Sequence, residues 1–517
     1  MHPVDDGHSP DLLATQCYNL GFAMTKSAPS ATQIPPETMA AYEPVIGLEV
    51  HVQLKTATKI FCGCSTRFGD PPNSNTCPVC LGLPGALPVL NRRALELALR
   101  ASLALNLRVQ ENSRFARKNY FYPDLPKGYQ ISMYELPLAL AGWLEIDHDG
   151  ARKRIGITRL HLEEDAAKNL HEGFPDSSTS SYIDYNRGGT PLAEIVSEPD
   201  LRSPTEAYAY LNALKQVLEY AEVSDCNMEE GSLRCDANVS VRKRGAERFG
   251  TKAEVKNLNS FRYLQRALEY EIERQIGVLE TGGRILQETR LWDVSEGRTV
   301  SMRSKEFAHD YRYFPDPDLL PVRVNASALA EIQSQMPELP EARRERFVAG
   351  YALSAYDAAV LTATRALADY FEAVVKAGAP AKTSANWIAT ELLRRLNDSG
   401  REIDASPVTP AALADLLRRV EAGSITGASG KKVFAAMFES GRTAEAIIAA
   451  EGLSQIQDTG EIERLCREVI EKNPENVAKY RAGNEGVFKF FVGQVIRASR
   501  GQANPQLVNE TLKRMLA

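Results

Sequence analysis

Glu49 and His51 stand two residues apart in a segment, Val45–Leu54, that alternates between apolar and polar side chains. This alternation predicts a strand, because successive side chains of a strand point to opposite faces and residues i and i+2 share one face. On that face the two side chains would lie about 6.8 Å apart, close enough to share a divalent cation or to flank a phosphate. A solvated sheet face gives the same pattern, so this pair alone leaves both interpretations open.

Further acidic residues occur in segments that otherwise predict strands. Glu194 lies within an apolar run, Glu254 is flanked by alanine and valine, and Glu164 ends the alternating segment 155–164. A buried carboxylate is costly unless it is paired or bound to a metal ion. Because Mg²⁺ prefers a few carboxylates together with phosphate oxygens, the repeated acidic positions favour a magnesium–phosphate site.

A basic and aromatic run extends from Arg117 to Tyr129 and includes Lys118 and Lys127. A lysine ammonium is a mobile point charge that suits phosphate groups, so both lysines are candidate phosphate contacts. A surface loop packed by its own tyrosines is the alternative interpretation. The chain has no Walker-type glycine loop and no His-Arg-Asp motif, so the use of ATP would require another architecture.

Four of the eight cysteines cluster as two close pairs separated by twelve residues. This spacing is typical of a tetrahedral zinc site, whereas four unrelated free thiols are the alternative. Such a zinc ion would be structural, because four thiolates leave no open position for a substrate. The candidate ligands are Cys62, Cys64, Cys77 and Cys80.

The C-terminal stretch from Asn476 to Ala517 combines apolar residues at helical spacing with a local excess of basic residues. On a chain of net charge −6 this local balance could contact nucleic-acid phosphates, although a solvated helix face is the alternative. The candidate contacts are Lys479, Lys489, Arg497 and Arg500.

The rest of the sequence indicates what must position these residues. With 517 residues the chain is too long for one core. Alternating segments rich in Gly and Pro predict an α+β domain with an antiparallel sheet, and Ser203-Pro204 predicts the start of one of its helices. Ala- and Leu-rich segments after a Pro337–Pro340 hinge predict helical domains. The expected divisions are a disordered extension at 1–41, the sheet domain at 42–335, a helical domain at 336–447 and a helical tail domain at 448–517.

Composition also excludes several classes of protein. Hydrophobic residues make up 44% and charged residues 25%, and no apolar run approaches the roughly 18 residues of a membrane span. The first 40 residues contain several acidic side chains and no basic segment followed by an apolar one, so we expect a cytoplasmic protein. No Gly-x-Ser-x-Gly elbow or amidase segment is present, so we do not expect this chain to release ammonia from glutamine by itself.

Together these segments resemble the B subunits of the glutamyl/aspartyl-tRNA amidotransferases, the GatB family. Several long blocks in one order carry the resemblance, which runs from about residue 42 to the end and is more specific than any single motif. The blocks are Val45–Leu54, Arg117–Ser132, Ile157–Asp165, Asp184–Ser197, Glu229–Ser240, Glu254–Phe261, Phe491–Val495 and Ala503–Pro505.

The resemblance implies a cradle-shaped catalytic domain related to the glutamine synthetase fold. It implies that ATP phosphorylates the side-chain carboxylate of Glu-tRNA(Gln) or Asp-tRNA(Asn), after which ammonia displaces phosphate to give the amide. Phosphoryl transfer depends on positioning and charge neutralisation, which agrees with the residues above. By position in the blocks, the Mg²⁺ and ATP-site residues would be Glu49, His51, Glu164, Glu194 and Glu254, with Lys118 and Lys127 on the phosphates.

The resemblance also implies partners: an amidase, the A subunit, that supplies ammonia through a channel, a small C subunit, and the tRNA held by the helical domains. Two other functions also fit parts of the sequence. A non-catalytic zinc-containing RNA-binding protein is opposed by the carboxylates, which would repel RNA unless a cation bridges them. A stand-alone ATP–ammonia ligase is opposed by the basic tail.

Overall fold

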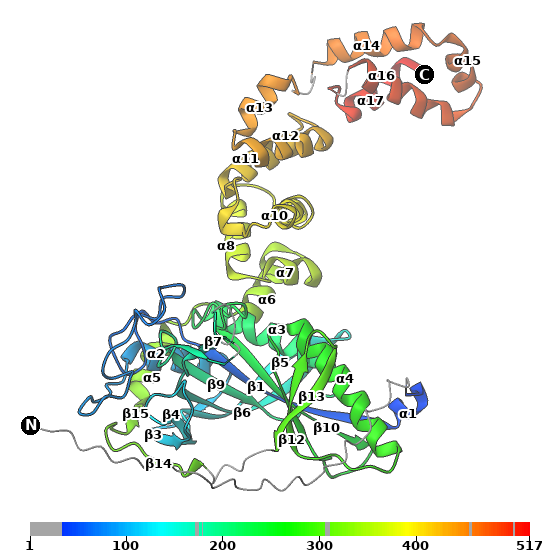
Figure 1. Ribbon diagram of the computed structural model, residues 1–517. Helices are drawn as coiled ribbons and strands as arrows, with labels where there is room; N and C mark the ends of the chain where they lie inside the picture. Colours follow the sequence, from blue (N-terminus) through cyan, green and yellow to red (C-terminus); the bar gives the residue numbers. More distant parts are fainter. Residues whose placement is uncertain are drawn as a thin grey trace, which may run out of the picture.

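The computed structural model shows a large sheet domain from which a column of helices rises to a separate C-terminal helical unit (Figure 1). Three hydrophobic cores follow one another along the chain, in residues 42–324, 347–448 and 462–516. The structure describes residues 34–170, 175–177, 179–304, 311–453, 458–499 and 502–516. Most of the extension expected to be disordered, residues 1–33, lies outside the described residues.

A 13-stranded sheet forms the first domain, with its main path in the order β13-β12-β11-β10-β1-β9-β6-β4-β3-β14. The predicted combination of a large sheet followed by many helices is confirmed. The strands of this sheet are β1 (Tyr42–Gln53), β2 (Arg108–Val109), β3 (Asn112–Asn119), β4 (Tyr129–Leu136), β5 (Ala139–His148), β6 (Ala151–Glu164), β9 (Pro191–Ser197), β10 (Leu233–Lys243), β11 (Ala253–Lys256), β12 (Glu288–Asp293), β13 (Arg298–Ser304), β14 (Phe314–Pro315) and β15 (Val322–Arg323). A separate hairpin pairs β7 (Lys168–Leu170) with β8 (Tyr182–Asp184).

The alternation predicted for Val45–Leu54 is confirmed in β1. Ile46, Leu48 and Val50 are fully buried or nearly so, whereas Glu49 and His51 are only half-buried on the opposite face. Burial of apolar side chains at roughly 25 cal/mol per Å² fixes this register, because a shift by one residue would expose every one of them.

One pair of neighbouring strands departs from the antiparallel pattern that the sequence predicted. β11 and β12 run parallel, with Glu254 opposite Thr289. The physical reason is the connection between them: a parallel pair needs a crossover, and the helix α4 (Phe261–Glu280) supplies it.

Three helices pack against the apolar face of the sheet: α2 (Arg92–Ala104), α3 (Pro204–Tyr220) and α4. The predicted start of α3 is confirmed, since the Ser203 hydroxyl accepts a hydrogen bond from the Glu206 amide at 3.1 Å. The Glu206 carboxylate in turn accepts from the amide of Arg202, one residue before the N-cap. These three helices thus leave the opposite, polar face of the central strands uncovered.

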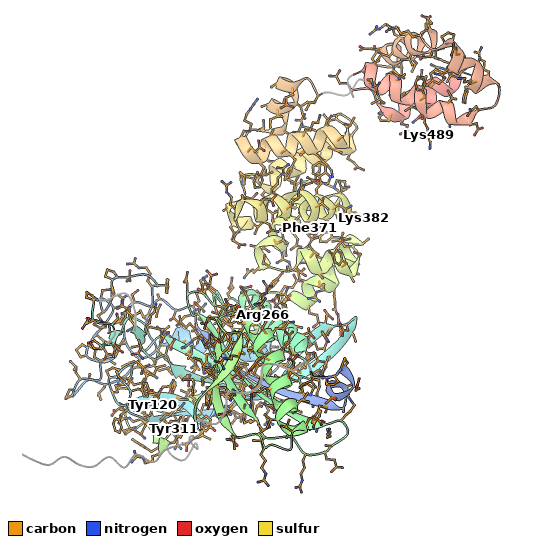
Figure 2. All side chains as sticks on the ribbon, turned by 45° about the vertical axis from the view of Figure 1, so that its right-hand side comes forward. Tyr120, Arg266, Tyr311, Phe371, Lys382 and Lys489 are labelled. Carbon is orange, nitrogen blue, oxygen red and sulfur yellow. The ribbon has the colours of Figure 1, made fainter. Side chains whose placement is uncertain are left out.

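The helices beyond the sheet domain begin with α5 (Ala326–Ser334), which packs on α2, and α6 (Pro340–Tyr351), which starts at the second proline of the predicted hinge. Phe371, labelled in Figure 2, packs its ring 5.0 Å from that of Phe347 in the second core. The column contains α7 (Ala355–Leu361), α8 (Arg365–Lys376), α9 (Ala381–Trp387), a π-helical turn (Ile388–Leu392), α10 (Leu393–Ser399), α11 (Pro410–Glu421), α12 (Gly427–Ser440) and α13 (Ala444–Glu451).

The C-terminal unit has its own core, in which Phe491 and Val495 are fully buried. Its helices are α14 (Thr459–Glu471), α15 (Pro474–Arg481), α16 (Phe488–Ala498) and α17 (Pro505–Leu516). No helix in the described part of the chain is both long and apolar enough to cross a membrane.

Candidate functional site

Five carboxylates gather on the polar face of the central strands, which we call the carboxylate face. The register explains why they meet: Glu49 lies opposite Asp236 on β10, while His51 lies opposite Glu194 on β9. Side chains directly opposite each other on antiparallel strands are close neighbours on the same face. The carboxylates of this face are Glu49, Glu163, Glu194, Asp236 and Glu254.

A β-bulge in β6 brings part of this set into place. Two residues of β6, Ile157 and Arg159, pair with the adjacent residues Ser197 and Val196 of β9, so Thr158 is an extra residue in the ladder. Before the bulge the odd-numbered side chains of β6 face the core, and after it the even-numbered ones do. The bulge therefore turns three polar side chains onto the carboxylate face: Arg159, His161 and Glu163.

His51, Glu163 and Glu194 form a candidate metal site. One ligand atom from each lies within 4.8 Å of the others. His51 Nε2 is 3.4 Å from Glu194 Oε2 and 3.7 Å from Glu163 Oε1. Nε2 of the fully buried His161 lies 3.5 Å from Glu194 and has no hydrogen-bond partner among the described residues. Carboxylate oxygens with an imidazole fit a divalent cation such as Mg²⁺ or Mn²⁺, and an orphaned buried nitrogen beside them agrees with that fit.

The electrostatics of this group favour a protonated His51 when no metal is bound. Burial would lower the pKa of His51, but the hydrogen bond with Glu194 and the charges of Glu194 and Glu163 outweigh it and raise the pKa to about 9. Burial acts in the opposite sense on Glu194, yet the neighbouring His161 and His51 hold the pKa of this carboxyl well below its usual range. A metal ion at this site must therefore displace a proton from His51.

We expect His51 to titrate near pH 9 in the metal-free protein. Its pKa in the folded state lies above the ordinary value of 6.5, so the His51–Glu194 pair contributes its full stability below about pH 6.5 and loses it as the pH rises through 9. NMR of the imidazole nitrogens, assigned with a His51→Asn variant, measures this pKa, and affinity for Mn²⁺ should rise with pH up to about 9. A His51 pKa at or below 6.5 would contradict the expectation.

The other half of the carboxylate face is paired with amide, hydroxyl and ammonium groups. Glu49 Oε1 accepts a hydrogen bond of 2.7 Å from the Asn238 side chain, and Glu254 Oε2 accepts one of 2.8 Å from Thr289. The Lys256 ammonium lies 2.5 Å from Asp236 Oδ2 and 3.5 Å from Glu254 Oε1. The predicted residues Glu49, His51, Glu194 and Glu254 thus share one face.

Glu164 lies apart from that face. It follows Glu163 directly in β6, so its side chain points to the other side of the sheet, where it accepts a 2.6 Å hydrogen bond from the Lys127 ammonium and another from the Ile131 amide. This pair lines a cavity of about 140 Å³ together with Lys59 and Cys80. The structure therefore brings Lys127 and Glu164 together with the cysteine loop and not with His51.

Lys118 lies at an aromatic group beside the carboxylate face. Its ammonium is 4.9 Å from the centre of the Tyr311 ring, and Tyr120 and Tyr311 lie side by side at the edge of the sheet domain (Figure 2). Tyr134 lies nearby: its ring centre is 6.3 Å from that of His161 in a T-shaped contact, and the Arg159 guanidinium lies over its ring at 4.7 Å. In this run Lys118 therefore packs against tyrosine rings, as the tyrosine-packed alternative predicted, and its contact with a phosphate stays a prediction.

Sequence reasoning missed four polar residues of this face. The signal for two of them was present: His161 and Glu163 have the i, i+2 spacing of Glu49 and His51, next to an acidic run. The signal for Asp236 was its place in the alternating segment 235–241. Lys256 follows Glu254 by two residues, which places both on one face of a strand.

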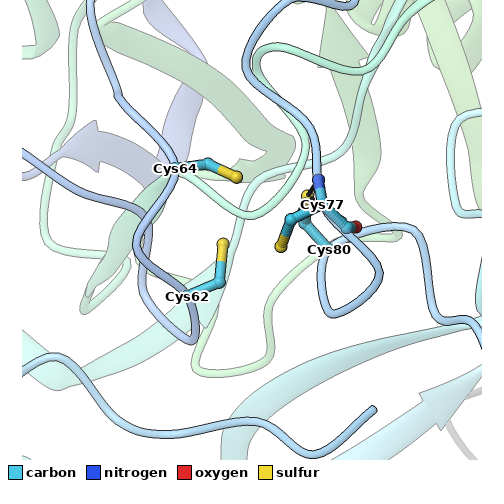
Figure 3. A group of neighbouring side chains, drawn as sticks. All are labelled: Cys62, Cys64, Cys77 and Cys80. Atoms are coloured by element: carbon cyan, nitrogen blue, oxygen red, sulfur yellow. Dashed lines mark hydrogen bonds between the residues drawn. The ribbon is translucent and has the colours of Figure 1, made fainter. Parts of the chain in front are cut away.

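The four predicted zinc ligands converge in the structure (Figure 3). Their sulfur atoms all lie within 4.8 Å of one another, so the cluster could hold a metal ion. The Sγ atoms of Cys77 and Cys80 are 3.9 Å apart, close to the ~3.8 Å edge of a tetrahedron with Zn–S bonds of about 2.3 Å. A hydrogen bond with Cys62 lowers the pKa of Cys80 to about 4, which provides the thiolate that a soft metal ion requires.

The cysteine loop is fixed to the sheet domain by backbone bonds and by one buried lysine. The amide of Lys59 donates to the carbonyl of Cys64, and the amide of Ile60 donates to the carbonyl of Gly189. Lys59 is fully buried, and its ammonium donates to the carbonyl of Tyr185 at 3.0 Å. The candidate metal centre thus joins the loop 57–91 to the segment 185–190.

The basic residues predicted for the tail lie on its surface. Lys479 is exposed on α15, and Lys489 and Arg497 are exposed on α16, where Figure 2 labels Lys489. Arg500 lies outside the described residues. The side chains of these three described residues are thus exposed to solvent.

Two family models match the chain. One, described as the GatB/GatE catalytic domain, covers residues 44–330 and therefore includes the carboxylate face and the cysteine cluster. The other, described as the GatB domain, covers residues 369–516.

Curated relatives are similar to the chain over nearly its full length. The B subunit of the aspartyl/glutamyl-tRNA(Asn/Gln) amidotransferase from Carboxydothermus hydrogenoformans is 57% identical over 479 residues, which are 93% of this chain and 100% of the relative. The protein of the same name from Geobacter sulfurreducens is 57% identical over 475 residues, 92% of this chain and 99% of the relative. The protein of that name from Caldanaerobacter subterraneus is 55% identical over 476 residues, which are 92% of this chain and 99% of the relative.

Proposed function

The chain belongs to the GatB family of amidotransferase B subunits, and from that premise we propose that it activates the side-chain carboxylate of Glu-tRNA(Gln) or Asp-tRNA(Asn) with ATP. The carboxylate oxygen attacks the γ-phosphorus, the bond to ADP breaks, and an acyl phosphate forms. Ammonia then attacks the acyl carbon, loses a proton and expels phosphate, which leaves Gln-tRNA(Gln) or Asn-tRNA(Asn). The observation that carries this proposal is the group of His51, Glu163 and Glu194 on the carboxylate face.

Five residues of the face would have parts in this reaction. His51, Glu163 and Glu194 would hold the magnesium ion that accompanies ATP, which neutralises phosphate charge during phosphoryl transfer. Glu49 and Glu254 complete the carboxylate set, held at fixed positions by the bonds from Asn238 and Thr289. Positioning of this kind is the main contribution that a protein makes to phosphoryl transfer.

We propose more limited roles than the sequence predicted for Glu164, Lys118 and Lys127. Lys118 stands beside the tyrosine group at the rim of the carboxylate face, from which it can reach a phosphate of ATP or of the tRNA end. Lys127 and Glu164 neutralise each other across the sheet from His51. We propose that they act at the cavity behind the face and not on the magnesium ion.

The remaining parts of the chain would support this chemistry. We propose that the first domain, to about residue 335, is a cradle related to glutamine synthetase, and that its four cysteines hold a structural zinc ion. The helical domain from 336 and the tail from 448 would hold the tRNA, with Lys479, Lys489, Arg497 and Arg500 on its phosphates. An amidase partner, the A subunit, would supply ammonia through a channel, and a small C subunit would complete the heterotrimer. The complex would act in the cytoplasm, where translation takes place.

Reconstitution tests the proposal. The chain is combined with its amidase and small partner subunits, Glu-tRNA(Gln) or Asp-tRNA(Asn), Mg²⁺, ATP and glutamine, and the aminoacyl product is measured. We expect amide product with glutamine, and also with ammonium chloride when the amidase partner carries an inactive site. Release of ADP without amidated tRNA, or amidation without ATP, would contradict the proposal. A non-catalytic RNA-binding role is not favoured, because the carboxylate face would repel a bare phosphate backbone.

A further inference from the structure

The proposed function requires positive charge beside the nucleotide phosphates, and the lysines expected there have other partners. Lys127 is bound to Glu164 on the opposite side of the sheet, and Lys118 lies against the rings of Tyr120 and Tyr311. Lys256 differs from both, because its side chain lies on the carboxylate face itself.

The strand register places Lys256 within the face. Ala237 of β10 pairs with Val255 of β11, so the next position along the ladder sets Lys256 beside Asp236. Asp236 in turn lies opposite Glu49 on β1. Lys256, Asp236 and Glu49 therefore form one row across three adjacent strands, next to the group that contains His51.

The contacts of Lys256 fix its ammonium and leave it accessible. Asp236 Oδ2 is 2.5 Å from Nζ and Glu254 Oε1 is 3.5 Å away. The side chain of Lys256 is 35% exposed, against 19% for Asp236 and 10% for Glu254. An ammonium has three N–H donors. Asp236 accepts a hydrogen bond from one of them and Glu254 forms a longer ion pair, so at least one donor is left for the open side of the face.

The charges on the face show why such a donor is needed. Without a cation, Glu49, Asp236 and Glu254 would repel a triphosphate, and a metal ion at His51 would serve only the other end of the face. A lysine already held in the row supplies a point charge to a phosphate oxygen without an ordering step when the nucleotide binds.

We infer that Lys256 contacts the phosphates of ATP, and that Asp236 and Glu254 are the positioning residues that aim its ammonium at them. This inference rests on the proposed function for the identity of the nucleotide. The competing explanation is structural: Lys256 would then only neutralise Asp236 and Glu254, and its loss would not change nucleotide affinity in particular.

The test compares Lys256→Met and Lys256→Arg in the assembled heterotrimer. Lys153→Met is the matched control, because Lys153 has a similar exposure of 33% and a comparable 2.7 Å contact with Glu206 but lies at the far end of β6. The readouts are the Kd of MgATP by calorimetry, the KM for ATP and kcat with ammonium chloride as nitrogen donor, and the Kd for tRNA.

For Lys256→Met we expect the Kd and KM for ATP to rise about tenfold to hundredfold, the usual effect of losing a hydrogen bond to a charged group. The Kd for tRNA should stay within twofold of wild type, Lys256→Arg should recover part of the ATP affinity, and Lys153→Met should change neither. An unchanged ATP affinity in Lys256→Met would overturn the inference. So would full recovery in the Lys256→Met, Asp236→Asn double variant, since that outcome requires only charge balance.

The two proposals fail in different ways. If the wild-type heterotrimer makes no amidated tRNA, the proposed function fails, whereas calorimetry with MgATP still reports on Lys256. If the wild type is active and Lys256→Met binds ATP normally, only the inference about Lys256 fails.

Discussion

Replacement of Glu194 by glutamine is expected to lower the kcat of amidation by about two to three orders of magnitude, the usual cost of removing one charge-stabilising group from an active site. Glu194 has the central place among the candidate ligands, with His51 at 3.4 Å, His161 at 3.5 Å and Arg159 at 3.3 Å. The amide keeps the size of the side chain but removes the charge that attracts a divalent cation. We therefore expect the variant to require more Mg²⁺ for half-maximal activity.

Glu198→Gln provides the matched control for this prediction. Glu198 follows the same strand, β9, but is exposed beyond its end and accepts a bond of 2.8 Å from the Thr158 hydroxyl, which a glutamine carbonyl can also accept. The control should keep the activity of wild type. The measurement is amidated tRNA formed per second in the heterotrimer at several Mg²⁺ concentrations. A Glu194→Gln variant with more than about a third of wild-type kcat would argue against a place for this carboxylate in the reaction.

Loss of one cysteine of the cluster should have the largest effect on stability. Structural zinc contributes on the order of 10 kcal/mol to the folded state of small zinc-binding domains. Replacement of Cys80 by serine removes one thiolate from the tetrahedral set, and even a third of that contribution would lower the Tm of the first domain by about 5 °C. Zinc content measured by mass spectrometry should fall from one ion per chain to well below one.

A cysteine outside the cluster serves as the control, because it separates the effect of losing zinc from the effect of losing a thiol. Cys226 is fully buried in the core of the first domain and lies far along the chain from the four ligands. Cys226→Ala should lose some stability through packing but keep a full zinc content. The assignment would be contradicted if purified wild-type protein contained no zinc, or if the Cys80→Ser variant kept an undiminished zinc content.

Local patterns predicted most of the secondary structure that carries the site. Alternation identified β1, β6 and β10, and a Ser-Pro pair identified the start of α3, because these signals depend on neighbours within a few residues. The same signals placed Glu49 with His51 on one face. Pairing between distant strands has no comparable local signal, which explains why the parallel position of β12 beside β11 was not predicted.

The local sequence pattern could not predict the bulge in β6. Ile155 and Ile157 face the core, and a uniform strand would have sent Glu163 to the core with them. Only the register against β9 reveals that Thr158 is an extra residue and that Glu163, not Glu164, joins His51. The pairing of Lys127 with Glu164 could not be predicted either, because the two residues are 37 positions apart and meet only through the packing of β4 and β6.

The extra residue in β6 also has a meaning for the gene. It is a single codon, and its presence sets which side chains of β6 face the core. Loss of the codon would leave the composition of the strand almost unchanged, yet it would exchange inside for outside over the six residues that follow. His161 and Glu163 would enter the core, and Leu160 and Leu162 would meet water. The number of residues in this strand therefore decides which of its side chains face the core and which face the carboxylates.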